Sequence, residues 1–164
     1  DKNGNLLTAA AEPEYIAPHC KKYEDYDRVM DAGASSKNIY FIRYADLILL
    51  YAECLLAEND LAGAKQQVIR VRNRAKVSTP ITASNNTEML DFIYEERMRE
   101  LGMEGWRRMD LIRRGADYFA AQVDKYNPFA KGNVQPYHAF YPIPTNEINM
   151  NDGIGAEDQN EGYK

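Results

Sequence analysis

Apolar residues dominate one stretch in the first half of the chain. Residues 43–58 carry leucine, isoleucine, alanine or tyrosine at most positions, on nearly every face of a helix with about 3.6 residues per turn. Such a pattern predicts a helix that is largely enclosed by protein. Asn59 and Asp60 end the stretch, and they offer a cap for a helix that follows.

The next stretch, residues 61–75, has the pattern of an amphipathic helix. Its apolar stripe comprises Leu61, Ala64, Val68 and Val71. Basic residues gather toward its C-terminal end, where the helix dipole favours cations. The two helices are therefore predicted to form a hairpin, and the small residues Ala52 and Ala64 fit the tetratricopeptide repeat, although that repeat's closing proline is missing at Lys76.

Two further helices are predicted in the second half of the chain. Thr87 can cap a helix that runs to about residue 101. Its apolar stripe comprises Leu90, Tyr94, Met98 and Leu101. A fourth helix is predicted over residues 105–127, where apolar residues recur at spacings of three and four until Asn127-Pro128 ends the pattern.

The two ends of the chain lack any sustained period. Residues 1–37 and 128–164 are rich in proline and glycine, so we expect irregular segments, with one short strand near residues 138–141. The predicted fold class is all-α, with at least four helices in tetratricopeptide-like hairpins between long irregular N- and C-terminal segments. We assign the helical core to residues 38–127 and expect one domain overall.

Composition and charge exclude several classes of protein. With 164 residues, of which 45% are hydrophobic, the chain can bury one core. Its net charge of -5 and pI near 5.1 argue against nucleic-acid binding, which depends on concentrated Lys and Arg. No stretch approaches the roughly 20 apolar residues that cross a bilayer. The first residues show no signal peptide, and this start is expected to be a cut rather than a natural beginning.

Three linked motifs occur in the second half of the chain. Residues 96–101 read E-R-M-R-E-L, residues 104–107 read E-G-W-R, and residues 110–115 read D-L-I-R-R-G. In this order they resemble the E-R-x-x-E-L, E-G-x-R and D-L-I-R-x-G blocks of the SusD/RagB family.

The flanking sequence carries the same resemblance. Residues 43–53 and 71–75 are similar to two helical motifs of the family, and residues 141–144 and 159–163 are similar to its closing Y-P-I-P and Q-N-P-G-Y signatures. Met109 and Arg114 stand where aromatic residues are frequent, and Glu161 stands where proline is usual. The resemblance runs from about Lys22 to the end. Because family members are far longer, it implies that this chain is their C-terminal portion.

The resemblance implies a function. SusD/RagB proteins capture a nutrient, most often an oligosaccharide, at the outer face of the outer membrane and deliver it to a SusC-like TonB-dependent transporter. Attachment to the membrane would be through a lipid anchor outside this chain. The resemblance implies binding without catalysis and no cofactor, with these residues serving mainly as scaffold. The alternative is a helical-repeat module that binds other proteins and has no ligand of its own.

The glutamates of the third predicted helix suggest a second alternative, the acid and base pair of a glycan hydrolase. Arginines crowd the same segment, however, and a neighbouring guanidinium lowers the pKa of a carboxyl group that would have to be raised in a catalytic acid. We therefore predict no catalytic residue, and instead a structural ion-pair motif between the third and fourth helices. It comprises Glu96, Arg97, Glu100, Glu104, Arg107, Asp110 and Arg113.

Aromatic residues offer the candidates for ligand contact. Tyr23 and Tyr26 lie in a predicted loop, where a flat ring with a hydroxyl suits sugar recognition. Trp106 follows a glycine at the start of a predicted helix and is expected to pack at the helix junction.

No metal site is predicted. His19 and His138 are far apart, and Cys20 beside His19 lacks the second ligand pair of a zinc site. The acidic runs lack the ligand spacing of a calcium loop. Cys54 is expected to be a small buried hydrophobic residue.

Overall fold

The computed structural model describes residues 21–23, 25, 35 and 37–164. The chain divides into two units, Asp1–Phe41 and Ile42–Lys164, and each is described by itself. In the first unit, the described residues include a short 3-10 helix, Lys21–Tyr23, and the Ser35 hydroxyl donates to the Asp25 carboxylate. All the other elements of the described residues lie in the second unit.

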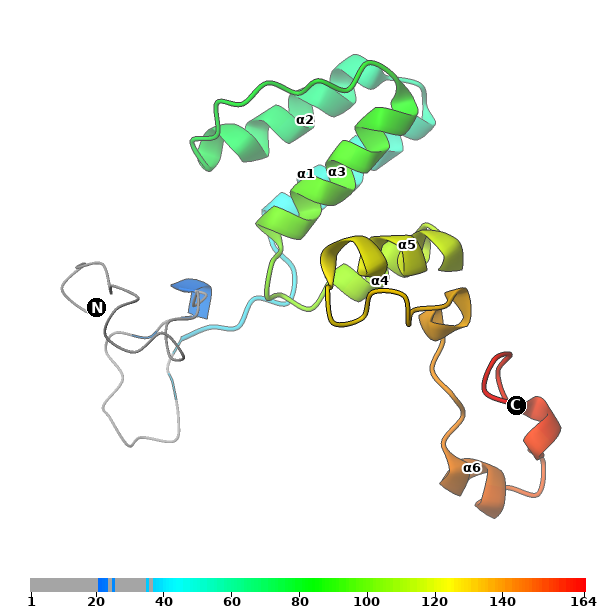
Figure 1. The fold of residues 1–164 in the computed structure, drawn as a ribbon. Coiled ribbons are helices and arrows are strands. Elements are labelled where there is room, and N and C mark those ends of the chain that lie inside the picture. Colours follow the sequence, from blue (N-terminus) through cyan, green and yellow to red (C-terminus); the bar gives the residue numbers. More distant parts are fainter. Residues whose placement is uncertain (1–20, 24, 26–34, 36) are drawn as a thin grey trace, which may run out of the picture. The chain divides into compact units, whose positions relative to one another are not determined.

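The second unit is helical throughout its regular structure (Figure 1). Its α-helices are α1 (Tyr44–Ala57), α2 (Leu61–Arg74), α3 (Asn86–Glu100), α4 (Arg107–Arg113), α5 (Ala116–Tyr126) and α6 (Thr145–Met150). Two short 3-10 helices, Pro136–Ala139 and Ala156–Asp158, lie in the C-terminal part. Because the described residues contain helices and no strand, the predicted all-α class is confirmed.

The α1–α2 hairpin forms as predicted, with ends within one residue of those expected. Asn59 adopts the left-handed conformation, with φ of 62°, that commonly ends a helix. The Asp60 side chain then accepts a hydrogen bond from the Gly63 N–H (2.8 Å) and caps α2. Ala52 and Ala64 are both fully buried and belong to the same hydrophobic core.

The third helix packs against both members of the hairpin, but its predicted cap is wrong. Its cap is Asn85, which accepts from the Glu88 N–H (3.0 Å), and not Thr87. The Glu88 carboxylate in turn accepts from Ser84, whose hydrogen bonds lower the pKa of Glu88. In the predicted stripe, Tyr94 and Leu101 are buried and Leu90 packs against the core, while Met89 and Ile93 extend the buried face.

The predicted fourth helix is two helices. α4 ends at Arg113, and Gly115 takes a φ of +105°, which is outside the range of helical residues. The Gly115 N–H donates to the Ile112 carbonyl (2.9 Å) and closes α4, while its own carbonyl accepts from Phe119 (3.0 Å) and opens α5. The sequence predicts one helix over residues 105–127 because the apolar spacing continues without interruption across Gly115.

The C-terminal segment contains short helices rather than the expected strand. Residues 138–141 overlap the 3-10 helix Pro136–Ala139, and Ala139 joins Leu111 and Phe119 in a small second core. Farther along, the Gln159 side chain bonds both the N–H (2.7 Å) and the carbonyl (3.0 Å) of Ile143. These contacts fold the last residues back onto the segment that precedes α6.

The outer side of α1 departs from the prediction of an enclosed helix. Tyr44, Leu47 and Tyr51 are 67%, 52% and 54% exposed. Cys54 is exposed as well, so the expectation that it is buried is wrong. Within the described part of the chain, α1 is covered on one side.

The glycine between α4 and α5 gives a test of this architecture. Gly115→Ala should lower the free energy of unfolding by about 1–2 kcal/mol, because a side chain disfavours the positive φ even though open space surrounds the site. Chemical denaturation measures the change. Gly102→Ala is the control, since Gly102 lacks a positive φ and a new methyl group would lie 3.4 Å from the nearest carbonyl. Equal effects of the two changes would contradict this account of the break.

Candidate functional site

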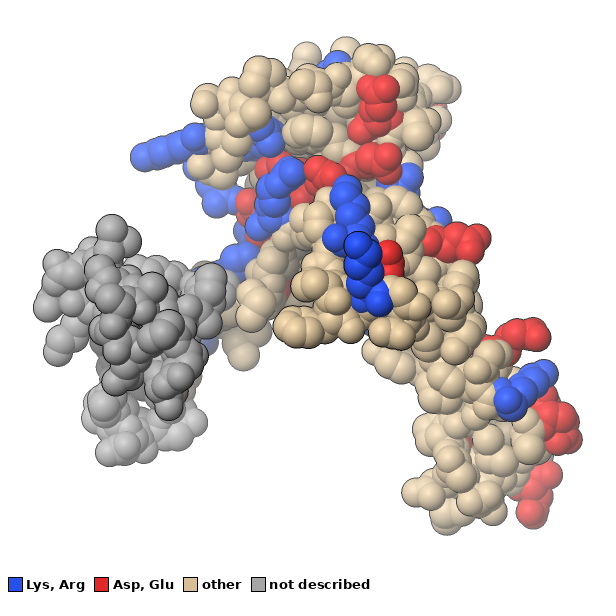
Figure 2. All heavy atoms as spheres, viewed as in Figure 1, with Lys and Arg blue, Asp and Glu red and all other residues tan. Residues whose placement is uncertain are grey.

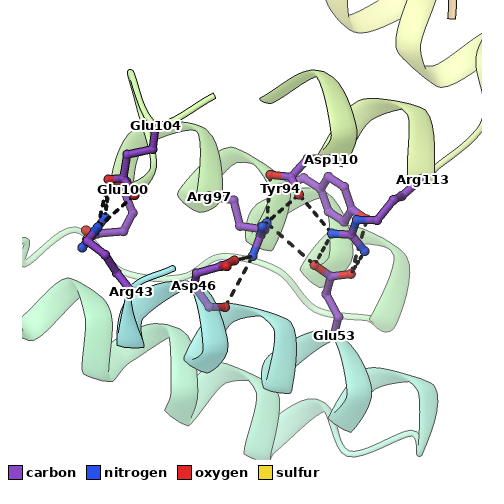
Figure 3. A network of polar contacts seen from close by, with 9 residues as sticks. All are labelled: Arg43, Asp46, Glu53, Tyr94, Arg97, Glu100, Glu104, Asp110 and Arg113. Carbon is purple, nitrogen blue, oxygen red and sulfur yellow. Dashed lines mark hydrogen bonds and ion pairs between the residues drawn. The ribbon is translucent and has the colours of Figure 1, made fainter. Parts of the chain in front are cut away.

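Arg97 lies at the centre of a buried network of charges that joins three helices (Figure 3). Its side chain on α3 is 2% exposed. One terminal nitrogen donates to Asp46 Oδ1 on α1 (2.6 Å). Its Nε and the other terminal nitrogen meet the two carboxylate oxygens of Asp110 on α4, each at 2.9 Å. The planar guanidinium thus holds α1 and α4 against α3.

The charge on Arg97 is maintained by its partners. Burial alone would lower the pKa of this guanidinium, but the hydrogen bonds and charges of Asp110 and Asp46 outweigh burial and raise the pKa above its ordinary value. Arg97 therefore stays ionised in the folded protein.

A second arginine, Arg113, extends the network to the C-terminal end of α4. Arg113 forms a bidentate pair with Glu53 of α1 (2.9 and 3.0 Å) and also donates to Asp110 (3.1 Å). The hydrogen bond to Glu53 is the main reason that the pKa of Arg113 is raised. The ring of buried Tyr94 lies beneath this guanidinium, 5.3 Å from its carbon, and the Tyr94 hydroxyl donates to Glu53 (3.3 Å).

The titration of Tyr94 reflects these surroundings. Burial, followed by the negative charge of Glu53, raises the pKa of Tyr94 to about 12. The neutral phenol is thus the form that the folded protein favours.

Arg43, directly before α1, anchors the loop that follows α3. Its Nε and one terminal nitrogen donate to the Glu104 carboxylate (2.7–2.9 Å), and the other terminal nitrogen donates to Glu100 (2.9 Å). The Glu104 side chain is 1% exposed. The loop can fold back to this arginine because Met103 and Gly105 take positive φ values of 66° and 84°.

The remaining motif residues face α2 and the main chain. Glu96 pairs with Arg72 of α2 (3.0 Å) and with Arg99 (3.2 Å), and Arg72 also donates to the Thr79 carbonyl (2.5 Å). Arg107 donates to the Tyr94 carbonyl (3.2 Å) rather than to a carboxylate among the described residues.

The ion-pair motif predicted between the third and fourth helices extends in the structure to α1 and α2. Its further partners include Arg43, Asp46, Glu53 and Arg72. One signal was available, because Asp46 shares a helical face with the core residues Leu49 and Ala52. An acidic residue on that face needs a buried cation as its partner.

The structure describes one of the two tyrosines that are candidates for ligand contact. Tyr23 is partly buried in the first unit, and Tyr26 lies outside the described residues. Trp106 precedes α4 and is partly buried. Ligand contact by Tyr23 or Tyr26 stays a prediction.

The contacts of the network hold helices and loops of the chain together. Each glutamate that suggested hydrolysis pairs with at least one arginine, so its carboxylate is engaged in a contact within the chain. In the part of the chain that the structure describes, no group of three or more metal-binding side chains converges. Figure 2 shows basic and acidic side chains side by side in the middle of the molecule's second unit, in keeping with paired charges.

Comparison with known proteins identifies the chain. The model of the SusD family matches residues 2–163, which include every residue of the network. This chain belongs to the SusD family. The resemblance read from the three linked motifs is thereby confirmed. No solved structure gives a significant match to the chain.

Individual members of the SusD family are similar over part of their length. SusD-like protein P25 of Formosa agariphila is 34% identical over 134 residues, covering 79% of this chain and 25% of the relative. The starch-binding protein SusD of Bacteroides thetaiotaomicron is 32% identical over 142 residues, covering 83% and 23%. This chain therefore spans about a quarter of the length of these relatives. Among the described residues, no helix is long and apolar enough to span a membrane.

Removing the central cation should destabilise the protein strongly. Arg97→Met leaves Asp46 buried without its cation and Asp110 with Arg113 alone, so the free energy of unfolding should fall by about 3–5 kcal/mol. Chemical denaturation measures the loss. The control is Arg99→Met, which removes ion pairs of an exposed arginine on the same helix and should cost less than about 1 kcal/mol. Similar losses from both variants would show that burial of the Arg97 pairs contributes little.

Tyr94 should make stability depend on pH in the alkaline range. Its pKa is about 12 in the folded protein and about 10 in the unfolded chain, so the unfolded state loses this proton first. The stabilisation that results from this difference in pKa is fully present below pH 10 and is lost as the pH rises from about 10 to about 12. In Tyr94→Phe the free energy of unfolding, measured by urea titrations at closely spaced pH values, should fall less steeply over that interval. Parallel curves for the two proteins would rule out this coupling.

Proposed function

We propose that this chain is scaffold for a surface protein that captures an oligosaccharide and delivers it to a SusC-like TonB-dependent transporter. The capture takes place at the outer face of the outer membrane, where residues outside this chain attach the protein through a lipid anchor. The protein binds its ligand without chemical turnover and without a cofactor. The observation that carries this proposal is the match of residues 2–163 to the SusD family.

The similarity to a starch-binding protein supports a glycan as the ligand. That relative is 32% identical over 83% of this chain, a range that includes most of the described helices. Because the similarity covers 23% of the relative, it bears on the ligand only through the function of the whole protein.

The internal contacts of the motif residues support a scaffold role for this portion. Arg97, Glu104 and Asp110 use their charged groups to bind other helices and loops of the chain, and their side chains are almost completely buried. A ligand could reach these groups only by separating the helices. Their place in the protein is to fix the helices that support a binding site formed elsewhere.

The alternative is a helical-repeat module that binds a protein and no glycan. The exposed apolar side chains of α1 favour this reading, because large apolar patches commonly mark contact with another protein surface. The two proposals differ in whether the purified protein binds any glycan.

A binding experiment on the full-length protein tests the proposed function. We expect isothermal titration with soluble plant, host and microbial oligosaccharides, including maltooligosaccharides, to give saturable binding for one class. We also expect a TonB-dependent transporter to co-purify with the protein from outer membranes. Tyr23→Ala and Tyr26→Ala should weaken binding at least fivefold if these rings touch the sugar, with Tyr126→Ala as the matched control on α5. Absence of glycan binding together with absence of the transporter would overturn the proposal.

A further inference from the structure

The segment that runs from α2 into the start of α3 carries an excess of positive charge. Residues 61–87 contain five basic residues and no acidic one, whereas the whole chain has a net charge of -5. The helix dipole accounts for basic residues near the C-terminal end of α2. It does not account for Lys65 in the first half of the helix, or for the lack of acidic residues after the helix ends. A local excess of this kind attracts anions.

The chain neutralises this excess in part. Two of the five cations pair with carboxylates of α3, as Arg72 with Glu96 and Arg74 with Glu100. The other three, Lys65, Arg70 and Lys76, form no ion pair with any residue that the structure describes. Positive charge on this side of α2 is therefore available to an external anion.

A groove lies beside the same part of α2. Its volume is about 310 Å³, and its walls are α2 and the segment of residues 77–81, which returns alongside the helix (Figure 1). On α2, Lys65, Ile69 and Asn73 follow one another at spacings of four residues, so they form one row along the groove. The volume is at the lower end of the range of about 300–1,000 Å³ that is usual for ligand pockets.

The second wall of the groove is held in place by the chain itself. Lys76 takes a φ of 56°, which ends α2 and reverses the chain, and the Val77 N–H donates to the Arg72 carbonyl (2.9 Å). The Arg72 guanidinium in turn donates to the Thr79 carbonyl (2.5 Å), and Ile81 packs against the first core. Because both walls are fixed in advance, a ligand does not have to order them.

The groups that line the groove suit an acidic sugar. Lys65 offers an ammonium group, Asn73 an amide, and Ser78 and Thr79 hydroxyl groups, while Ile69 offers an apolar surface to the C–H groups of a sugar ring. No acidic side chain is among the described residues that line it. An ammonium group binds a carboxylate or sulfate more strongly than a neutral hydroxyl, because the hydrogen bond is charge-assisted.

The nearby Glu88 does not occupy this role. Its pKa is lowered mainly by the hydrogen bond from the Ser84 N–H and least by the charge of Lys65. The Glu88 carboxylate is thus held by Ser84 at the start of α3, and its interaction with Lys65 acts through space.

We propose that this groove is an accessory subsite for an acidic sugar, either a uronate or a sulfated sugar, and that Lys65 binds its carboxylate or sulfate. Asn73 and Ser78 bind hydroxyl groups of the same sugar. A narrow groove lined by amide and hydroxyl groups fits a sugar chain, whereas a lipid surface would lie across both walls. The inference rests on the proposed function, because it requires that the protein captures a glycan, and it adds that this glycan is anionic.

Lysine acetylation in the full-length protein tests whether the groove is open and occupied. The anionic probes are fragments of polygalacturonate, alginate and chondroitin sulfate, and methyl-esterified polygalacturonate is the neutral match of the first. We expect at least one anionic probe to slow acetylation of Lys65 by N-hydroxysuccinimidyl acetate at least fivefold, with no change at Lys131, an exposed lysine beyond α5. Lack of protection by all three, equal protection by the neutral match, or a Lys65 that is unreactive without any ligand would overturn the subsite.

A substitution gives an independent readout in the same full-length protein. Lys65→Gln should raise the dissociation constant for the protecting polysaccharide at least fivefold, measured by affinity electrophoresis, because the ammonium group is lost. Lys131→Gln makes the same change in net charge outside the groove and should alter it less than twofold. Equal effects of the two substitutions would show attraction by net charge alone and contradict a subsite at Lys65.

The same measurements separate this inference from the proposed function. Capture of neutral glycans alone would overturn the acidic subsite and leave the proposed function standing. Absence of binding to any glycan would overturn the subsite together with the glycan as the proposed ligand.

Discussion

The pairing of Arg97 with Asp46 and Asp110 is the interaction on which the helical arrangement depends. A guanidinium that is almost fully buried is stable only if carboxylates and good hydrogen-bond geometry replace its hydration. Its two partners belong to different helices, so the requirement fixes α1 and α4 against α3 at the same time. Arg113 and Glu53 then neutralise charge at the edge of this centre. Apolar contacts alone would allow α3 to pack in several registers along α1 and α4, whereas the buried ion pairs form in few of these registers.

This dependence separates what identifies the family from what performs its function. The linked motifs of residues 96–115 are recognisable because their charged residues must meet at fixed positions. In the structure those charged residues form contacts between helices. Arg43 binds Glu104 in the loop after α3, and Arg72, a partner of Glu96, donates to the Thr79 carbonyl. A sequence signature can therefore be strong evidence for membership of the SusD family while its charged groups bind other parts of the same chain.

Local signals explain which parts of the fold the sequence predicted. Asn59 and Asp60 give the end of α1 and the start of α2, and Ala64, Val68 and Val71 are buried as their period indicates. Two buried positions of α3, Glu96 and Arg97, fall outside its predicted stripe because they are charged and do not count as apolar. The break at Gly115 was missed because the apolar period continues across it. The role of α1 in the network depends on contacts between distant residues, which no local period contains. Ligand contact by Tyr23 or Tyr26 likewise depends on contacts that a local pattern does not contain, and it stays a prediction.

The separation of the network's members along the chain has a consequence for synthesis. Arg97 follows Asp46 by 51 residues, and Asp110 follows Arg97 by 13. At about 5–20 residues per second, the ribosome needs roughly 3–10 seconds to add the intervening segment. The hairpin is complete only after Arg74, so 23 residues (75–97), or roughly 1–5 seconds of synthesis, separate its completion from Arg97. In that interval Asp46 has no cation and Leu49 has no α3 to cover it, so the nascent hairpin exposes a face that is both charged and apolar and that chaperones can bind.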